Sequence, residues 1–164
     1  MRAVARYVWI MVLVLGVAAL AMGAVFIYQG VTVNNLVTNQ MAQEKVTFGI
    51  DPALVAKGEV IHTAEEAMHA ADVIKEHRHA IAPTYQDLLA ASGGKFDPTN
   101  PIDITYGQAI NMENYLYLGV LAFGVAQIVI ASGVFMLIMG IALLGIGLVL
   151  RLVVPAKSPG SNTG

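Results

Sequence analysis

A stretch of 36 residues without a charge, 115–150, constrains the fold of this chain more than any other feature. The hydrocarbon core of a bilayer is about 30 Å thick and needs about 20 apolar residues of helix. The stretch is therefore long for one membrane span and barely long enough for two. Charged residues make up 12% of the chain, whereas a soluble domain carries about 25%. We therefore expect an all-α membrane protein.

Small residues recur at every seventh position in two parts of the chain. Near the N-terminus they are Gly16, Gly23 and Gly30. In the charge-free stretch they are Gly119, Ala126, Gly133, Gly140 and Gly147. Two helices with small residues at this spacing can bring their backbones close along a left-handed seam. We predict that these residues are the helix-packing sites of an antiparallel two-helix transmembrane hairpin.

Residues 7–29 form the first predicted transmembrane helix, behind a short segment, 1–6, that carries two arginines. Because cytoplasmic flanks are rich in Lys and Arg, we expect 1–6 in the cytoplasm. A secretory signal peptide is the alternative, but its apolar core is usually about 7–15 residues long. The longer run here favours an uncleaved anchor. Residues 30–47 keep apolar side chains at helical spacing, which predicts an extension of the helix outside the membrane.

Residues 48–104 have the composition of a soluble protein, and we predict that they form a small helical extracytoplasmic domain. Asp51 followed by Pro52 is typical of a helix start, which predicts a short helix over 52–57. No alternating apolar pattern of strand length occurs in this region, so we expect it to be all-α like the rest of the chain.

Two further helices are predicted in this domain. Thr63 and Glu66 form a capping-box pattern that opens a helix over 64–81. The apolar face of that helix is Ala67, Ala70, Ala71, Ile74 and Ile81. Pro83 then predicts the start of another short helix that ends at Ala91, before a break at the following Ser-Gly-Gly.

A second capping-box pattern, Thr105 with Gln108, predicts that the last helix begins near Tyr106. We expect an outer part over 105–126, a second transmembrane helix over 127–150, and a cytoplasmic tail over 151–164. A hairpin of two short spans with a turn at 131–133 stays open as an alternative. One span is favoured because it returns the basic tail to the cytoplasm.

The outer part of the last helix is apolar nearly all round, and such a helix needs neighbours on every side. A second column of small residues, Gly124, Ala131 and Gly145, lies roughly opposite the first. We predict that this second packing face meets another subunit, in a homo-oligomer, or a helix of a larger membrane complex. The expected location is the cytoplasmic membrane, with both termini inside and residues 30–126 outside. The lipid bilayer is the other expected partner, and the net charge of −2 suggests no nucleic acid.

All four histidines lie close together in the chain, at His62, His69, His77 and His79. With Glu76, the candidate metal ligands are His69 and His77, since imidazole and carboxylate bind zinc or iron. Metal sites on one helix favour histidines four residues apart, and no such pair is present. No nucleophile-elbow, P-loop, dinucleotide or c-type haem motif occurs. We therefore predict no catalytic residue and no cofactor.

Two segments, AEEAMHAADVIKEHRHAIAPTYQDLLAASGGKFDPTNP and ITYGQAINMENYLYLGVLAFGVAQIV, carry a family resemblance. They resemble small bacterial two-span membrane proteins, some of which bear the label "aromatic ring-opening dioxygenase". Extradiol enzymes of that name hold iron with two histidines and a carboxylate. Because this chain has no such arrangement, the resemblance implies the membrane topology and no catalytic residue.

These patterns favour a non-enzymatic function, as a membrane-anchored structural or accessory subunit that acts through helix packing and its outer domain. Two alternatives remain. The first is an extracytoplasmic sensor or ligand- and metal-binding protein that uses the histidine-rich helix, because histidine titrates near physiological pH. The second is a metal-dependent enzyme, as the label of the resembling proteins suggests.

Overall fold

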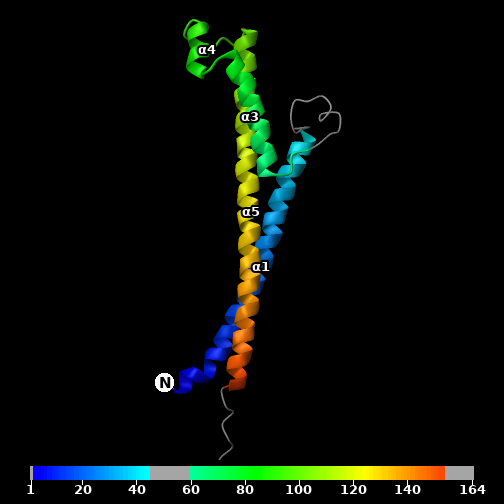
Figure 1. Cartoon of the computed structure of the whole chain (residues 1–164), viewed down its shortest axis with the longest axis vertical. Coiled ribbons are helices and arrows are strands. Elements are labelled where there is room, and N and C mark those ends of the chain that lie inside the picture. The colour runs from blue at the N-terminus through cyan, green and yellow to red at the C-terminus, as the bar shows by residue number, and fades with distance from the viewer. Residues whose placement is uncertain (1, 45–59, 154–164) are drawn as a thin grey trace, which may run out of the picture. The chain divides into compact units, whose positions relative to one another are not determined.

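A computed structural model describes residues 2–44 and 60–153 of the chain, with side chains from residue 7 onward. Its regular elements are four helices (Figure 1). They are α1 (Arg2–Gln43), α3 (Ala64–Ile81), α4 (Tyr85–Ala91) and α5 (Pro101–Val153). The all-α prediction is confirmed for the described part of the chain. Two of these helices are long and apolar enough to cross a membrane, over Tyr7–Gln43 and Pro101–Val153.

Helix α5 is continuous for 53 residues. Residues 131–133, where a two-span hairpin would turn, lie inside the helix. The hairpin alternative for the charge-free stretch is therefore wrong in this structure. The prediction of a single helix needs one correction, because α5 begins at Pro101 and not near Tyr106. Four residues assigned to the preceding domain, 101–104, thus belong to this helix.

The start of α5 explains why the capping-box pattern at Thr105 misled the prediction. Proline is favoured at the first position of a helix, where its missing N–H costs nothing. The side-chain oxygen of Asn100 accepts a hydrogen bond from the backbone N–H of Ile102 at 3.0 Å, which caps the helix there. The hydroxyl of Thr105 instead donates to the carbonyl oxygen of Pro101 at 2.8 Å, as a threonine inside a helix does.

Helix α3 begins where the sequence predicts. The Thr63 hydroxyl accepts from the backbone N–H of Glu66, and the Glu66 carboxylate accepts from the backbone N–H of Thr63, both at 3.2 Å. This capping box is the predicted one. Helix α4 begins at Tyr85 and not at Pro83, because Thr84 is its N-cap and accepts from the Asp87 N–H.

Helices α1 and α4 end in different ways. Helix α1 ends at Gln43, so the predicted extension over 30–47 is helical to that residue. Residues 45–47 of the predicted extension and the predicted helix over 52–57 lie outside the described residues. After α4, Gly93 and Gly94 have φ angles of 75° and 88°, a conformation that glycine adopts without strain. The Gly94 N–H donates to the Leu89 carbonyl at 2.7 Å and closes the helix end.

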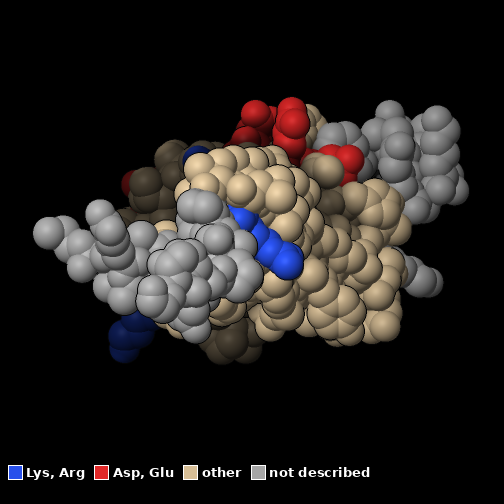
Figure 2. Space-filling view, turned by 90° about the horizontal axis from the view of Figure 1, so that it is seen from below, with Lys and Arg blue, Asp and Glu red and all other residues tan. Residues whose placement is uncertain are grey.

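The chain divides into two compact units, each described by itself. The helix-pair unit comprises residues 2–29 of α1 and 129–153 of α5. The α3–α4 unit comprises residues 30–44 and 60–128, and so contains α3, α4 and the remaining parts of α1 and α5. Most of the described surface seen in Figure 2 is tan and so carries no Lys, Arg, Asp or Glu.

The core of the α3–α4 unit forms where α3 lies against α1 and α5. Its buried residues are Met41, Ile61, Ala67, Ala70, Ala71, Leu116 and Phe123. The three alanines belong to the predicted apolar face of α3, and their small side chains let the helix approach its neighbours closely. Ile74 packs partly buried against this cluster, but Ile81 is 38% exposed. The prediction that Ile81 belongs to the buried face is therefore wrong. Ile81 is the last residue of α3, beyond the end of the buried cluster.

Candidate functional site

In the helix-pair unit the predicted glycines lie at the contact between α1 and α5. A Cβ added to Gly23 would stand 2.8 Å from the carbonyl oxygen of Gly133, and one added to Gly133 would stand 2.8 Å from that of Gly23. At Gly16 the nearest backbone atom is the Gly140 carbonyl oxygen, at 3.1 Å. The two backbones therefore approach to a distance that only glycine permits.

Each of these glycines also faces a large side chain of the other helix. On α5, Gly133, Gly140 and Gly147 face Ile27, Leu20 and Leu13 in turn. On α1, Gly16 and Gly23 face Leu144 and Leu137. Large residues of one helix thus fill the space left by small residues of the other, in an antiparallel pair. We refer to this contact as the glycine seam.

The remaining predicted packing residues lie in the α3–α4 unit. Gly30 and Ala126 are buried, and the Met41 side chain occupies the space beside Gly119. The second predicted face is different. Ala131 and Gly145 are exposed, and among the described residues no atom outside the adjoining turns of α5 lies within 4 Å of a Cβ added to Gly124 or Gly145. In the part of the chain that the structure describes, this second face has no neighbour at those two glycines.

The histidines do not converge. His62, His69, His77 and His79 are all exposed. Among the described residues, no group of three or more metal-ligating side chains could hold a metal ion. His69, Glu76 and His77 are therefore not brought together as a ligand set. The backbone N–H of His62 donates to the Glu66 carboxylate at 2.7 Å, so that residue belongs to the cap of α3.

The polar centre of the α3–α4 unit is an ion pair between α3 and α5. The Arg78 Nε donates to the Glu113 carboxylate at 2.8 Å, and the two side chains are only 12% and 11% exposed. Arg78 also donates to the Tyr106 hydroxyl at 2.7 Å, and its guanidinium lies 5.2 Å from the centre of the Tyr106 ring. The hydrogen bond to Glu113 raises the pKa of Arg78 above its ordinary value.

A second buried carboxylate holds the loop before α5. Asp103 is fully buried. It accepts from the Ser92 hydroxyl at 2.6 Å and from the Asp97 backbone N–H at 2.8 Å. Asp97 in turn accepts from the hydroxyl and the backbone N–H of Thr99, and these bonds lower the pKa of Asp97. The Asp103 carboxylate thus fixes the end of α4 and the loop against the first turn of α5, and the Asp97 carboxylate closes a turn within the loop.

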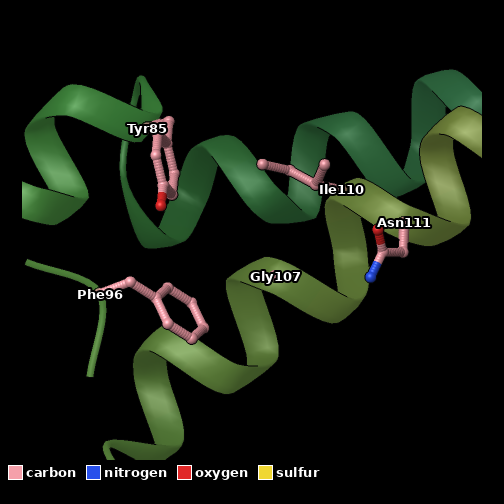
Figure 3. Close-up of a pocket in the computed structure, with 5 residues that line it drawn as sticks. All are labelled: Tyr85, Phe96, Gly107, Ile110 and Asn111. Carbon is pink, nitrogen blue, oxygen red and sulfur yellow. The ribbon is translucent and has the colours of Figure 1, made fainter. Parts of the chain in front are cut away.

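An open hollow of about 360 Å³ lies beside this network, between α4, the loop and α5. It is lined by Tyr85, Phe96, Gly107, Ile110 and Asn111, and Figure 3 shows the two aromatic rings on one side with Asn111 further along α5. A Cβ added to Gly107 would stand 3.4 Å from the Phe96 ring, an ordinary contact distance. None of these five described residues is a histidine or carries a charge.

The sequence analysis missed Arg78, Glu113, Tyr106 and Asp103. Two signals could have found the ion pair. Arg78 is the only arginine between Arg6 and Arg151, and Glu113 is the last charged residue before the charge-free stretch. Arg78 lies on a helix with an alanine-rich buried face, and Glu113 lies at the edge of an apolar run. Two opposite charges in such apolar surroundings can be expected to pair. Their spacing of 35 residues carries no local signal.

Comparison with protein-family models, with curated proteins and with solved structures finds no match to this chain.

Proposed function

We propose that this chain is a non-enzymatic, membrane-anchored structural or accessory subunit. In this proposal α1 and α5 cross the cytoplasmic membrane as an antiparallel pair. The two termini lie in the cytoplasm, and α3 and α4 stand outside as a small binding module. The resemblance to two-span bacterial membrane proteins supports the same topology.

The glycine seam is the observation that carries the proposal. In a bilayer, apolar side chains gain nothing from leaving lipid, so helices associate through close packing at small residues. The seam provides that packing between two helices whose described side chains in the helix-pair unit include one charge, Arg151. Its guanidinium lies 5.4 Å from the centre of the Trp9 ring. Tryptophan and arginine together are typical of a membrane–water interface.

The chemistry of the α3–α4 unit favours binding over catalysis. Its two buried carboxylates already have partners, Arg78 for Glu113 and the Ser92 hydroxyl for Asp103. These bonds tie helices and loops together. A group used in this way stabilises the unit, and a catalytic acid or base would need access to a substrate.

The topology can be tested directly because the chain has no cysteine. Single cysteines would be introduced at Gln86, exposed on α4, and at Leu152, exposed at the end of α5. In sealed right-side-out vesicles, we expect a membrane-impermeant maleimide to label Gln86→Cys. Leu152→Cys should react only after detergent is added. The reverse pattern, or equal labelling of both sites in sealed vesicles, would refute the proposed orientation.

The open hollow favours a second candidate function, a ligand-binding or sensor module outside the membrane. Its aromatic rings and the Asn111 amide suit a small, mostly apolar ligand with one polar group. The histidine-rich helix does not line it. Screening by thermal shift, with Phe96→Ala as the control that removes one wall, would test this function. A ligand that stabilises the wild type and Phe96→Ala equally binds elsewhere.

A further inference from the structure

Buried polar groups hold both aromatic walls of the open hollow in place. The Tyr85 ring lies 6.3 Å, centre to centre, from the ring of Tyr106, which is fully buried and hydrogen-bonded through its hydroxyl. Phe96 directly precedes Asp97, whose backbone N–H donates to the buried Asp103 at 2.8 Å. The positions of the two rings are therefore set before a ligand arrives, which lowers the entropy cost of binding.

Two polar groups in the hollow are available to a ligand. Tyr85 and Asn111 both line it, and neither side chain makes a hydrogen bond to another residue in the described part of the chain. Figure 3 shows the Tyr85 hydroxyl directed toward the side where Phe96 lies. A hydroxyl and an amide can each donate to a carbonyl oxygen. Because no lining residue is charged, an uncharged ligand fits the hollow best.

The hollow is open and does not enclose its occupant. The side chains of Tyr85 and Phe96 are 42% and 37% exposed. Pockets for free small molecules usually bury about 70–90% of the surface of the ligand. An occupant of this hollow is covered on one side only, whereas a chain that crosses the hollow can add contacts beyond its rim. This geometry favours a segment of a partner protein.

The known modes of peptide recognition narrow the choice of segment. Strand addition needs the edge of a sheet, and the elements of the described chain are all helices. Acidic and phosphorylated motifs need clustered arginines, and none lines the hollow. A helix needs an apolar groove several turns long, and the hollow holds about 360 Å³. Proline-rich segments instead dock on aromatic rings, and their carbonyl oxygens carry no internal hydrogen bonds.

We propose that the open hollow binds an uncharged, proline-rich segment of a partner protein in the polyproline II conformation. A proline ring packs against Phe96 and Tyr85, and the Tyr85 hydroxyl and the Asn111 amide donate to backbone carbonyl oxygens. Because proline has a fixed φ angle, such a segment loses little freedom on binding. This inference rests on the proposed function, since it names the partner of the binding module outside the membrane.

Peptide binding to the full chain in lipid nanodiscs tests the inference by fluorescence polarisation. The probe is a labelled, capped polyproline peptide of about ten residues, which is about 30 Å long. A capped Gly-Ser peptide of the same length is its control. We expect saturable binding of the polyproline peptide alone, with an affinity that changes little with ionic strength because no charges meet. No saturable binding, or equal binding of the two peptides, would overturn the inference.

Three substitutions test whether the peptide lies in the hollow. Phe96→Ala should weaken binding about tenfold or more, because one apolar wall is lost. Asn111→Ala, at an exposed position, and Tyr85→Phe should each weaken it about two- to tenfold, because each removes one hydrogen-bond donor. Tyr115→Ala removes an exposed ring of α5 outside the hollow and should bind like the wild type. An affinity that none of the first three substitutions changes would overturn the site.

Maleimide labelling of Gln86→Cys in sealed vesicles separates this inference from the proposed function. Outside labelling without peptide binding refutes the proline site alone. Peptide binding with labelling only after detergent is added supports the site and refutes the proposed orientation. If an uncharged small molecule stabilises the wild type but not Phe96→Ala, and the peptide does not bind, the hollow takes a free ligand and the inference is overturned.

Discussion

At the scale of the residue, buried polar side chains decide how the α3–α4 unit holds together. Arg78, Glu113 and Tyr106 tie α3 to α5, and Asp103 ties the loop to α5. No buried side-chain nitrogen or oxygen among the described residues lacks a hydrogen-bond partner. Removing one member of such a pair leaves the other desolvated without compensation, so the loss should exceed the strength of the bond itself.

The ion pair gives the first prediction. We expect Arg78→Met to lower the free energy of unfolding by about 1–3 kcal/mol, because Glu113 is left largely buried without its partner. Arg78→Met/Glu113→Met should cost less than the sum of the two single changes, since no orphan charge remains. Lys95→Met, at an exposed position, is the control and should change stability by less than about 0.5 kcal/mol. Additive losses measured by denaturant unfolding would argue against a coupled pair.

Asp97 gives a prediction with a defined pH window. Its folded-state pKa lies below the ordinary 3.8 because Thr99 donates to its carboxylate. Such a group contributes stability above the unfolded pKa, and this contribution is lost as the pH falls through the folded pKa. Asp97→Asn should therefore melt at a lower temperature than the wild type near pH 6. The difference should disappear as the pH falls well below 3.8. A difference that persists at low pH would show that the carboxylate charge is not its cause.

At the scale of the element, the helices follow from the chain's local patterns. The capping box at Thr63 predicted the start of α3, because a cap depends only on residues that are close in sequence. The seven-residue glycine repeat predicted a close contact between α1 and α5, because such a repeat places small residues on one face of a helix. The predicted start of α5 was wrong because Asn100 caps the helix and Pro101 begins it, four residues before the pattern at Thr105. The Arg78–Glu113 pair could not be predicted, since it forms only when two distant helices meet.

The glycine seam predicts opposite effects for two glycines of α5. A Cβ at Gly133 would meet the Gly23 carbonyl oxygen at 2.8 Å, whereas one at Gly145 would meet nothing within 4 Å. We expect Gly133→Ala to lower the melting temperature in detergent, at a cost of about 1–3 kcal/mol from overpacking. Gly145→Ala should leave the melting temperature unchanged or raise it, because alanine favours helix. Equal effects of the two changes would mean that the helices are not in backbone contact.

The continuity of α5 is testable by hydrogen exchange in proteoliposomes. If residues 131–133 lie inside one helix, their amides should exchange as slowly as those of the turns on either side. A turn at this position would release several backbone N–H groups from helical hydrogen bonds. Fast exchange confined to 131–133 would therefore restore the two-span alternative for the charge-free stretch.

At the scale of the whole molecule, the two units differ in what stabilises them. The helix-pair unit relies on glycine contacts and apolar side chains. The α3–α4 unit has a mixed core with a buried ion pair and capped helices, as a water-soluble unit does. This difference in chemistry supports the proposed membrane span for one unit and an aqueous setting for the other.

The structure gives a prediction for the metal content of the purified protein. Since no ligand group of three or more side chains occurs among the described residues, we expect purified protein to carry far less than one equivalent of iron or zinc. Treatment with a chelator should leave its melting temperature unchanged. Stoichiometric metal, with a melting temperature that falls when the metal is removed and recovers when it is restored, would favour the enzyme and metal-sensor alternatives over the proposed function.

The glycine seam has a property that its individual contacts do not reveal. Leu13, Leu20 and Ile27 recur every seven residues, as do the glycines that they face, Gly147, Gly140 and Gly133. A shift of one helix by seven residues would therefore present each leucine with an equivalent glycine. The repeat determines which faces of the two helices meet, but it does not by itself determine their alignment along the helix axis. The contact between Trp9 and Arg151 lies outside the repeat and exists only in the observed alignment, so it favours that alignment over the shifted one.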